Sequence, residues 1–261
     1  MGLLSHRVER SDIVAGDHIY SWRTSFLYSH HGIFFGENIV IHFTNDDPTI
    51  KSKSNDRSSF ITCTSSTPSI TCTSTCAITK LQTTCSYPKY CGFRKQDSGV
   101  KISCLDCFLG NGSLYLYQYD VAWYYLIAKI RGGTCTTAKS DPPEIVFRRA
   151  MYLLLDHGFG EFDLLENNCE DFALYCKTGR LLYSRGERVG GSGQVSSVVG
   201  VPTSVAVGFF LSGPVALATT AALYSFNRYS IDLIYRLRGI KVAVEDLAKF
   251  RANGNRPMKK D

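Results

Sequence analysis

The stretch YSHHGIFFGENIVIHF, residues 28–43, decides the fold that we expect for this chain. It holds two apolar runs, residues 32–36 and 39–43, which are joined by the short polar pair Glu37-Asn38. A third run with strand-like composition, residues 17–22, follows Gly16. Three short strands with glycine or asparagine turns between them predict an antiparallel meander.

Two histidines twelve residues apart lie in this region. His30 enters the second strand, and His42 ends the apolar run of the third. Two strands joined by a short turn can bring both side chains onto one face, where one imidazole accepts a thiol proton and the other orients the first. A metal-binding pair is the competing interpretation, but it needs a third ligand.

The segment Asn167-Asn168-Cys169-Glu170-Asp171 carries the cysteine that we expect to use this pair. Asn168 is a preferred helix N-cap, and Gly179 has the position of a C-terminal stop, so a helix is predicted from Cys169 to about Thr178. The first position of a helix stabilises a thiolate by about 0.3–1 kcal/mol. Without the histidines, a buried apolar cysteine would be the simpler interpretation.

Other segments supply the remaining elements. Residues 144–154, behind Pro142-Pro143, have the spacing of an amphipathic helix that ends near Gly158. Residues 114–128 are rich in aromatic side chains and are compatible with one or two further strands. Twelve of the nineteen residues from 58 to 76 are Ser or Thr, which is typical of a loop or disordered insertion.

A second group of cysteines indicates a different kind of site. The sequence has ten cysteines. Its first residues are not expected to act as an apolar secretory signal, so we expect the cysteines as reduced thiols, metal ligands or a nucleophile. A C-x-x-C unit is an element of zinc knuckles, and a tetrahedral site needs a second pair. The candidate ligands for a structural zinc ion are Cys85, Cys91, Cys104 and Cys107, with buried thiols as the alternative.

The C-terminal part differs in composition from the rest. Residues 189–227 contain no charged side chain, and residues 198–224 are mostly apolar but interrupted by Gly213-Pro214. A membrane span needs about 20 apolar residues, so the length permits a single span. Gly213-Pro214 near the middle and basic residues on both sides favour a re-entrant hairpin, with a helical pair packed on the domain as the alternative. Of the net charge of +6, +5 lies in residues 225–261, which suits an anionic membrane surface. No nucleic-acid partner is expected, because a broad basic stripe with interleaved aromatics is missing from the sequence.

Taken in order, these motifs resemble the lecithin:retinol acyltransferase domain, and most closely the plant NC-domain proteins. The resemblance covers about residues 10–180, with an insertion at about 45–90, and leaves residues 181–261 as an apolar membrane-associating segment and basic tail. It implies an α+β fold, a circularly permuted papain-like domain with a small antiparallel sheet packed on helices. The motifs that carry the resemblance are Gly16-Asp17-His18-Ile19-Tyr20, Tyr28-Ser29-His30-His31-Gly32, Val40-Ile41-His42-Phe43 and Asn168-Cys169-Glu170-Asp171-Phe172.

The resemblance also implies a role for each motif residue. His30 would be the base, His42 would polarise it, and Cys169 would attack an acyl ester to form a thioester. The animal enzymes have an aromatic residue at the position of His31 and a histidine at that of Asp171, so retinol is not implied as the acceptor.

The expected function is therefore a cytoplasmic, membrane-associated thiol acyltransferase or phospholipase. It would take an acyl chain from a membrane glycerolipid, pass it to a small acceptor, and need no cofactor for catalysis. A papain-like peptidase or amidase with the same three residues is one alternative. A non-catalytic membrane adaptor of the same fold, with a site altered at Asp171, is the other. The sequence gives no prediction of oligomeric state.

Overall fold

The computed structural model describes residues 5–23, 28–45, 91–95, 99–129, 131–164, 167–184, 187–188 and 213–247. The insertion predicted at residues 58–76, Cys85, and residues 198–212 of the apolar C-terminal segment lie outside the described residues.

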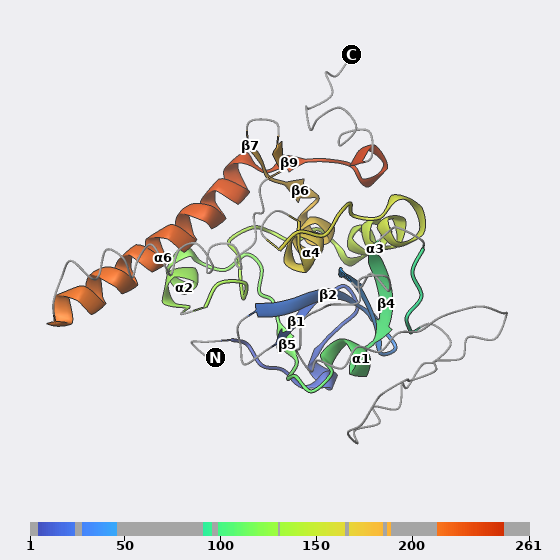
Figure 1. The fold of residues 1–261 in the computed structure, drawn as a ribbon, viewed down its shortest axis with the longest axis horizontal. Coiled ribbons are helices and arrows are strands. Elements are labelled where there is room, and N and C mark those ends of the chain that lie inside the picture. Colours follow the sequence, from blue (N-terminus) through green and yellow to red (C-terminus); the bar gives the residue numbers. More distant parts are fainter. Residues whose placement is uncertain are drawn as a thin grey trace, which may run out of the picture.

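A five-stranded antiparallel sheet with the order β4-β3-β2-β1-β5 forms the centre of the fold (Figure 1). The prediction of an antiparallel meander is confirmed, since β1 pairs with β2, β2 with β3, and β3 with β4. The mixed α and β class with a small antiparallel sheet is confirmed as well. The strands are β1 (His18–Arg23), β2 (Tyr28–Gly36), β3 (Ile39–Phe43), β4 (Val100–Cys104) and β5 (Tyr115–Leu116).

The turn between β2 and β3 fixes which side chains share a face. Glu37 and Asn38 both have positive φ, 46° and 69°, which is the backbone twist that a two-residue hairpin requires. Ile33 lies opposite Ile41 in the ladder, whereas Phe34 lies opposite Val40. Because directly opposite residues point to the same side of a sheet, these two pairs line opposite faces.

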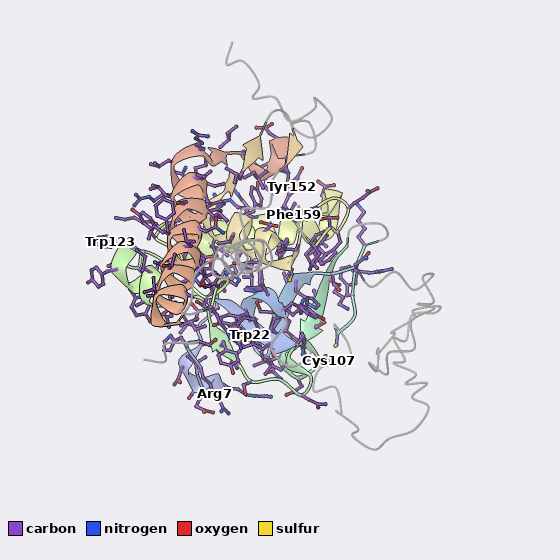
Figure 2. All side chains as sticks on the ribbon, turned by 60° about the vertical axis from the view of Figure 1, so that its left-hand side comes forward. Arg7, Trp22, Cys107, Trp123, Tyr152 and Phe159 are labelled. Carbon is purple, nitrogen blue, oxygen red and sulfur yellow. The ribbon has the colours of Figure 1, made fainter. Side chains whose placement is uncertain are left out.

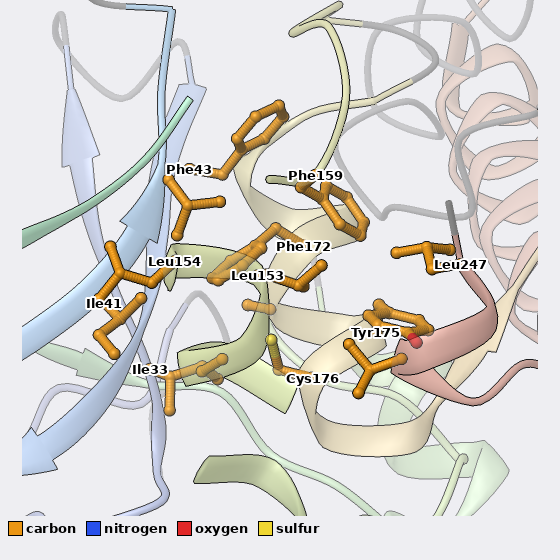
Figure 3. Packing of buried hydrophobic residues seen from close by; sticks show 14 of the residues in the cluster. Ile33, Ile41, Phe43, Leu153, Leu154, Phe159, Phe172, Tyr175, Cys176 and Leu247 are labelled. Carbon is orange, nitrogen blue, oxygen red and sulfur yellow. The ribbon is translucent and has the colours of Figure 1, made fainter. Parts of the chain in front are cut away.

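Two helices cover the first face. They are α3 (Pro143–Tyr152), which continues as a π-helical turn over Leu153–His157, and α4 (Cys169–Thr178). Figure 3 shows Ile33, Ile41 and Phe43 of the sheet meeting Phe159 and Phe172 in the core between them. Both predicted helices are confirmed, and Gly158 ends the π-helical turn, as the sequence indicated.

The second face of the sheet packs against a short helix, α1 (Leu105–Leu109). Phe34 and Val40 contact Leu105 and Phe108 in a separate buried cluster. Gly32 allows this close packing, because a Cβ there would lie 2.7 Å from Val40 Cγ1 and 3.0 Å from Phe108.

One prediction was wrong in part. Residues 115–116 form β5, as one further strand was expected, but residues 123–128 at the end of the aromatic-rich segment form the helix α2 (Trp123–Ala128) instead of a second strand. α2 packs on the helix α6 (Gly213–Arg238). This contact comes from a distant part of the chain, so the sequence around residues 123–128 does not reveal it. The ring of Trp123 lies 6.4 Å from that of Tyr229 of α6.

The C-terminal half of α6 is fixed to the domain by polar contacts. Tyr235 Oη lies 2.7 Å from Thr178 Oγ1 at the end of α4, and Asp232 accepts a 2.5 Å hydrogen bond from Thr136. Figure 1 shows the other half of α6 extending beyond the rest of the fold. Small elements complete this region: β6 (Arg180–Leu181) pairs with β9 (Ile240–Lys241), β7 (Tyr183–Ser184) pairs with β8 (Glu187–Arg188), and a 3-10 turn occupies Val244–Asp246. A second 3-10 turn, Arg10–Asp12, lies beside α1, where Arg10 pairs with Asp106.

The described portion of the C-terminal segment starts as α6 at Gly213 and runs as a helix to Arg238. Among the described residues, no helix combines the length and the hydropathy needed to cross a bilayer.

Candidate active site

The start of α4 is held by a reciprocal capping arrangement. Asn168 Oδ1 accepts the backbone N–H groups of Glu170 (2.8 Å) and Asp171 (3.1 Å), while Asp171 Oδ2 accepts the N–H of Asn168 (3.1 Å). Three N–H groups at the start of the helix are therefore satisfied by side chains. This arrangement sets Cys169 as the first residue of the helix, as predicted.

The capping arrangement explains one of the two departures from the animal enzymes. Asp171 occupies the third helical position, where a carboxylate reaches back to the N-cap amide. Only 7% of its surface is exposed. Asp171 is thus an integral part of the helix start that carries Cys169.

The Cys169 thiol is buried between α4 and the sheet. Its Sγ lies 3.6 Å from the backbone carbonyl oxygen of Ser29, the residue before His30. The positive end of the helix dipole favours a negative charge at this position. The side chain itself is 3% exposed.

His30 and His42 are joined on the opposite side of β2 and β3 from α4. His30 Nε2 lies 2.8 Å from His42 Nδ1, and His42 Nε2 lies 2.8 Å from Ser103 Oγ on β4. The ring of Phe108 stands against both imidazoles, at 5.2 and 5.4 Å. The structure therefore forms a continuous chain from His30 through His42 to Ser103.

Both histidines are neutral at neutral pH. Burial, followed by the positive charges of Arg23 and Lys101, lowers the pKa of His30 to about 3. Burial also lowers the pKa of His42 well below its usual range, with contributions from His30, Lys101 and Arg23. A neutral imidazole is the form that can accept a proton.

Arg23 links the surroundings of the thiol and of His30. Burial lowers the pKa of Arg23, and the negative charges that Tyr28 and Cys169 can carry act to raise it. The same guanidinium contributes to the lowered pKa of His30. It is held in place by hydrogen bonds to the carbonyl oxygens of Phe108 and Leu109. One cation thus lies within electrostatic reach of both Cys169 and His30.

A second histidine chain lies on the α4 face of the sheet. His31 Nε2 is 2.8 Å from Ser29 Oγ, and His31 Nδ1 is 2.8 Å from His18 Nε2. His18 Nδ1 in turn lies 2.8 Å from Tyr119 Oη. Burial lowers the pKa of both imidazoles well below the usual range.

The second chain accounts for the other departure from the animal enzymes. The His31 ring stacks on Tyr20 at 5.2 Å, and the His18 ring stacks on Tyr117 at 4.3 Å. The flat imidazole ring of His31 can therefore stack as an aromatic residue would. Its two nitrogens have hydrogen-bond partners in Ser29 and His18.

Sequence reasoning missed Arg23, Ser103 and the pair His18–His31. Their partners come from distant segments, so no local spacing points to them. His18 stands in the Gly16-Asp17-His18 motif, and that motif was the one available signal.

Three of the four predicted zinc ligands are gathered at a separate place. The sulfur atoms of Cys91, Cys104 and Cys107 all lie within 4.8 Å of one another. Cys85, the fourth, lies outside the described residues. Cys176 of α4 is fully buried in the core.

Known proteins resemble this chain over most of its length. The family profile described as Lecithin retinol acyltransferase matches residues 11–182. Protein LEAD-SENSITIVE 1 of Arabidopsis thaliana, a plant NC-domain protein, is 41% identical over 263 residues, covering 97% of this chain and 93% of that protein. No solved structure matches the chain. The chain thus belongs to the lecithin retinol acyltransferase family, as the order of its histidine and cysteine motifs suggested.

Proposed function

We propose that this protein is a membrane-associated thiol acyltransferase or phospholipase that acts on glycerolipid acyl chains. The observation that carries the proposal is the hydrogen-bonded chain from His30 through His42 to Ser103. His30 directly follows Ser29, whose backbone carbonyl oxygen contacts the Cys169 thiol. The family assignment supports acyl transfer as the reaction class. We also infer a circularly permuted papain-like arrangement, because the histidine strands precede the cysteine helix.

The proposed reaction has two halves. The first half requires the Cys169 thiol, which contacts the Ser29 carbonyl, and the His30 ring, which lies beside Phe108 of α1, to come into contact. His30 then takes the thiol proton, and the Cys169 sulfur attacks the carbonyl carbon of a lipid ester. The ester C–O bond breaks, the leaving alkoxide receives the proton from His30, and a thioester remains on Cys169. An amine, alcohol or water then gives a proton to His30 and attacks the thioester, which releases the acylated product and restores the thiol. Cys169 supplies the nucleophile and His30 the base, so the proposed reaction needs no cofactor.

The hydrogen-bond chain is compatible with the tautomer that this reaction needs. If His42 Nε2–H donates to Ser103 Oγ, then His42 Nδ1 accepts the Nε2–H of His30. The remaining ring nitrogen of His30, Nδ1, then carries a lone pair and can take the thiol proton. Ser103 and His42 act as positioning residues in this scheme.

Two donors at the helix start are not available to the oxyanion. The N–H groups of Glu170 and Asp171 already bind Asn168 Oδ1. We propose the backbone N–H of Cys169 itself as one oxyanion donor, since it lies at the same helix end. The Arg23 guanidinium adds positive charge nearby.

An exposed apolar surface supports a bilayer as the place of action. On α6, the side chains of Val215, Leu223, Phe226, Ile234 and Leu237 recur at helical spacing and are all exposed; we call this set the apolar stripe. At 3.6 residues per turn the stripe spans an arc of about 100°.

Neighbouring groups complete a surface suited to phospholipid. Trp123 on α2 is 58% exposed, and Figure 2 shows it projecting outward beside α6. Exposed Arg236 and Arg238 stand at the end of α6, where they can meet lipid phosphates. Amphipathic helices with aromatic and basic residues bind bilayer surfaces in this way. We therefore propose peripheral binding of phospholipid through the apolar stripe.

Two assays test the proposed function. The purified full chain should release lysolipid from dispersed phospholipid, Cys169→Ser should abolish that turnover, and Cys176→Ala, which alters a buried thiol of the same helix, should retain it. Cleavage of peptides but not of lipids would refute the substrate class, and undiminished turnover by Cys169→Ser would refute the mechanism.

Vesicle binding tests the surface. Phe226→Ser with Leu237→Ser should weaken partitioning to phosphatidylcholine vesicles containing phosphatidylserine at least about 10-fold, since each buried apolar side chain contributes about 1.5–3 kcal/mol. Val14→Ser, which changes an exposed apolar residue outside the stripe, is the matched control. Equal partitioning of the double variant and the control would contradict the proposal.

A further inference from the structure

A compact cluster of three cysteines lies where β4 meets α1. Cys91 belongs to a turn that pairs with β4, Cys104 is the last residue of β4, and Cys107 lies in the first turn of α1. Cys91 and Cys104 are buried, whereas Cys107 is partly exposed. Figure 2 shows Cys107 beside these strands, away from α6.

The spacing of the sulfur atoms suits one metal ion. Zinc binds thiolates at about 2.3 Å in tetrahedral geometry, which puts two ligand sulfurs about 3.8 Å apart. The three Sγ atoms already lie within 4.8 Å of one another. Shifts of about 1 Å or less in the sulfur positions bring each pair to this spacing.

Backbone donors surround two of the sulfurs. The N–H of Cys104 points to Cys91 Sγ, and the N–H of Cys107 points to Cys104 Sγ, both at 3.4 Å. Amide hydrogen bonds to sulfur favour the thiolate, which is the form that binds metal, whereas the neighbouring Cys104 and Cys107 thiols and burial raise the pKa of Cys91. Such outer contacts orient metal ligands in known sites.

The backbone holds the three residues together independently of any metal. Gly92 N–H donates to Ile102 O, and Ile102 N–H donates to Phe93 O, both at 2.8 Å. These two bonds tie the Cys91 turn to β4. The cluster is thus preorganised by strand pairing.

We propose that Cys91, Cys104 and Cys107 form a thiolate site for one zinc ion. Three deprotonated thiolates and Zn²⁺ carry a net charge of −1, and each thiol releases its proton to solvent on binding. Tetrahedral coordination requires a fourth donor besides these three thiolates. The ion is structural: it cross-links the Cys91 turn, the end of β4 and α1.

The site has a consequence for the proposed catalytic chain. Ser103, which contacts His42, precedes Cys104, and Phe108, which packs on both imidazoles, follows Cys107. Zinc bound here would hold these two residues in place. This consequence rests on the proposed function, whereas metal binding itself does not.

Metal content and cobalt spectroscopy test the proposal directly. The full chain, purified under reducing conditions without chelator, should carry one zinc per molecule by native mass spectrometry. After replacement by Co²⁺, it should show a sulfur-to-cobalt charge-transfer band with tetrahedral d–d bands. Cys104→Ser should lose the metal, whereas Cys169→Ser and Cys176→Ala should keep it.

A second variant guards against misfolding. Cys107→His keeps a ligand at a partly exposed position, so it should still bind Co²⁺, with the charge-transfer intensity lowered by about a third because two thiolates remain of three. Absence of a charge-transfer band in the wild-type chain would overturn the proposal. So would a disulfide between two of the three cysteines in the reduced preparation, or metal content unchanged by Cys104→Ser in a folded protein. Loss of phospholipid turnover in a zinc-loaded chain would count against the proposed function alone.

Discussion

Replacing Asp171 with alanine removes the carboxylate that accepts the Asn168 backbone N–H at the start of α4. Asn168 is fully buried, so its N–H loses a partner that water cannot readily replace. An unsatisfied buried donor costs about 1–3 kcal/mol, and loss of an acidic residue from the first helical turn costs about 0.3–1 kcal/mol more. We therefore expect Asp171→Ala to destabilise the protein by about 2 kcal/mol.

This free energy corresponds to a measurable change in melting temperature. For a chain of 150–250 residues, 1 kcal/mol shifts the melting temperature by about 2–4 °C, so Asp171→Ala should lower it by about 4–8 °C. Asp171→Asn is the matched control: its amide oxygen can still accept the Asn168 N–H, and the loss should be less than half as large. Circular dichroism melts at 222 nm provide the measurement.

Turnover separates a capping role from contact with substrate. Well below the melting temperature, Asp171→Asn should keep most of the wild-type phospholipid turnover, because the helix start that carries Cys169 is preserved. Melting temperatures of both variants equal to that of the wild type would refute the capping argument. Unchanged stability with lost turnover would instead indicate that Asp171 contacts the substrate.

Three further predictions concern other parts of the structure. Ser103→Ala removes the hydrogen-bond partner of His42 and should lower kcat about 10-fold with little change in KM; unchanged kcat would exclude Ser103 from positioning the histidines. Burial lowers the pKa of His18, His31 and His42 below the unfolded value of 6.5, so the unfolded chain binds more protons than the folded one. The stabilisation that this difference gives is therefore fully present above pH 6.5 and is lost as the pH falls. Between pH 7.5 and 5.5, the free energy of unfolding should fall by up to about 1.4 kcal/mol for each histidine, or about 4 kcal/mol for the three. Urea titrations at the two pH values measure this difference, and equal free energies of unfolding would refute the neutral burial of these histidines. Gly179→Ala places a Cβ 2.5 Å from the Arg149 guanidinium at φ 67°, so the melting temperature should fall by at least about 2 °C, and an unchanged value would contradict the packing at the end of α4.

Local signals were sufficient for the elements that carry the candidate site. The asparagine before Cys169 and the glycine after Thr178 bound α4 through capping chemistry that involves only neighbouring residues. The hairpin of β2 and β3 likewise follows from two apolar runs around a turn. These features depend on contacts within a few residues, so the sequence alone predicts them.

Features that depend on distant contacts could not be predicted. Residues 123–128 look like a strand by composition, but they form a helix that packs on α6, about 100 residues later. The His18–His31 pair needs the register that sets Tyr20 opposite His31, and Ser103 reaches His42 only because β4 pairs with β3. The roles of Arg23 and Ser103 became visible only with the fold.

The central claim is that Cys169 becomes acylated by a lipid ester, and intact mass spectrometry tests it most directly. The full chain should be incubated with phosphatidylcholine of a single acyl composition and quenched in acid. We predict a mass increase of one acyl group minus one hydrogen, located on Cys169, removed by hydroxylamine and absent from Cys169→Ser. An acyl adduct on another residue would contradict the account. It would also be contradicted if the wild type released lysolipid with no adduct on Cys169 at any quench time and Cys169→Ser retained turnover.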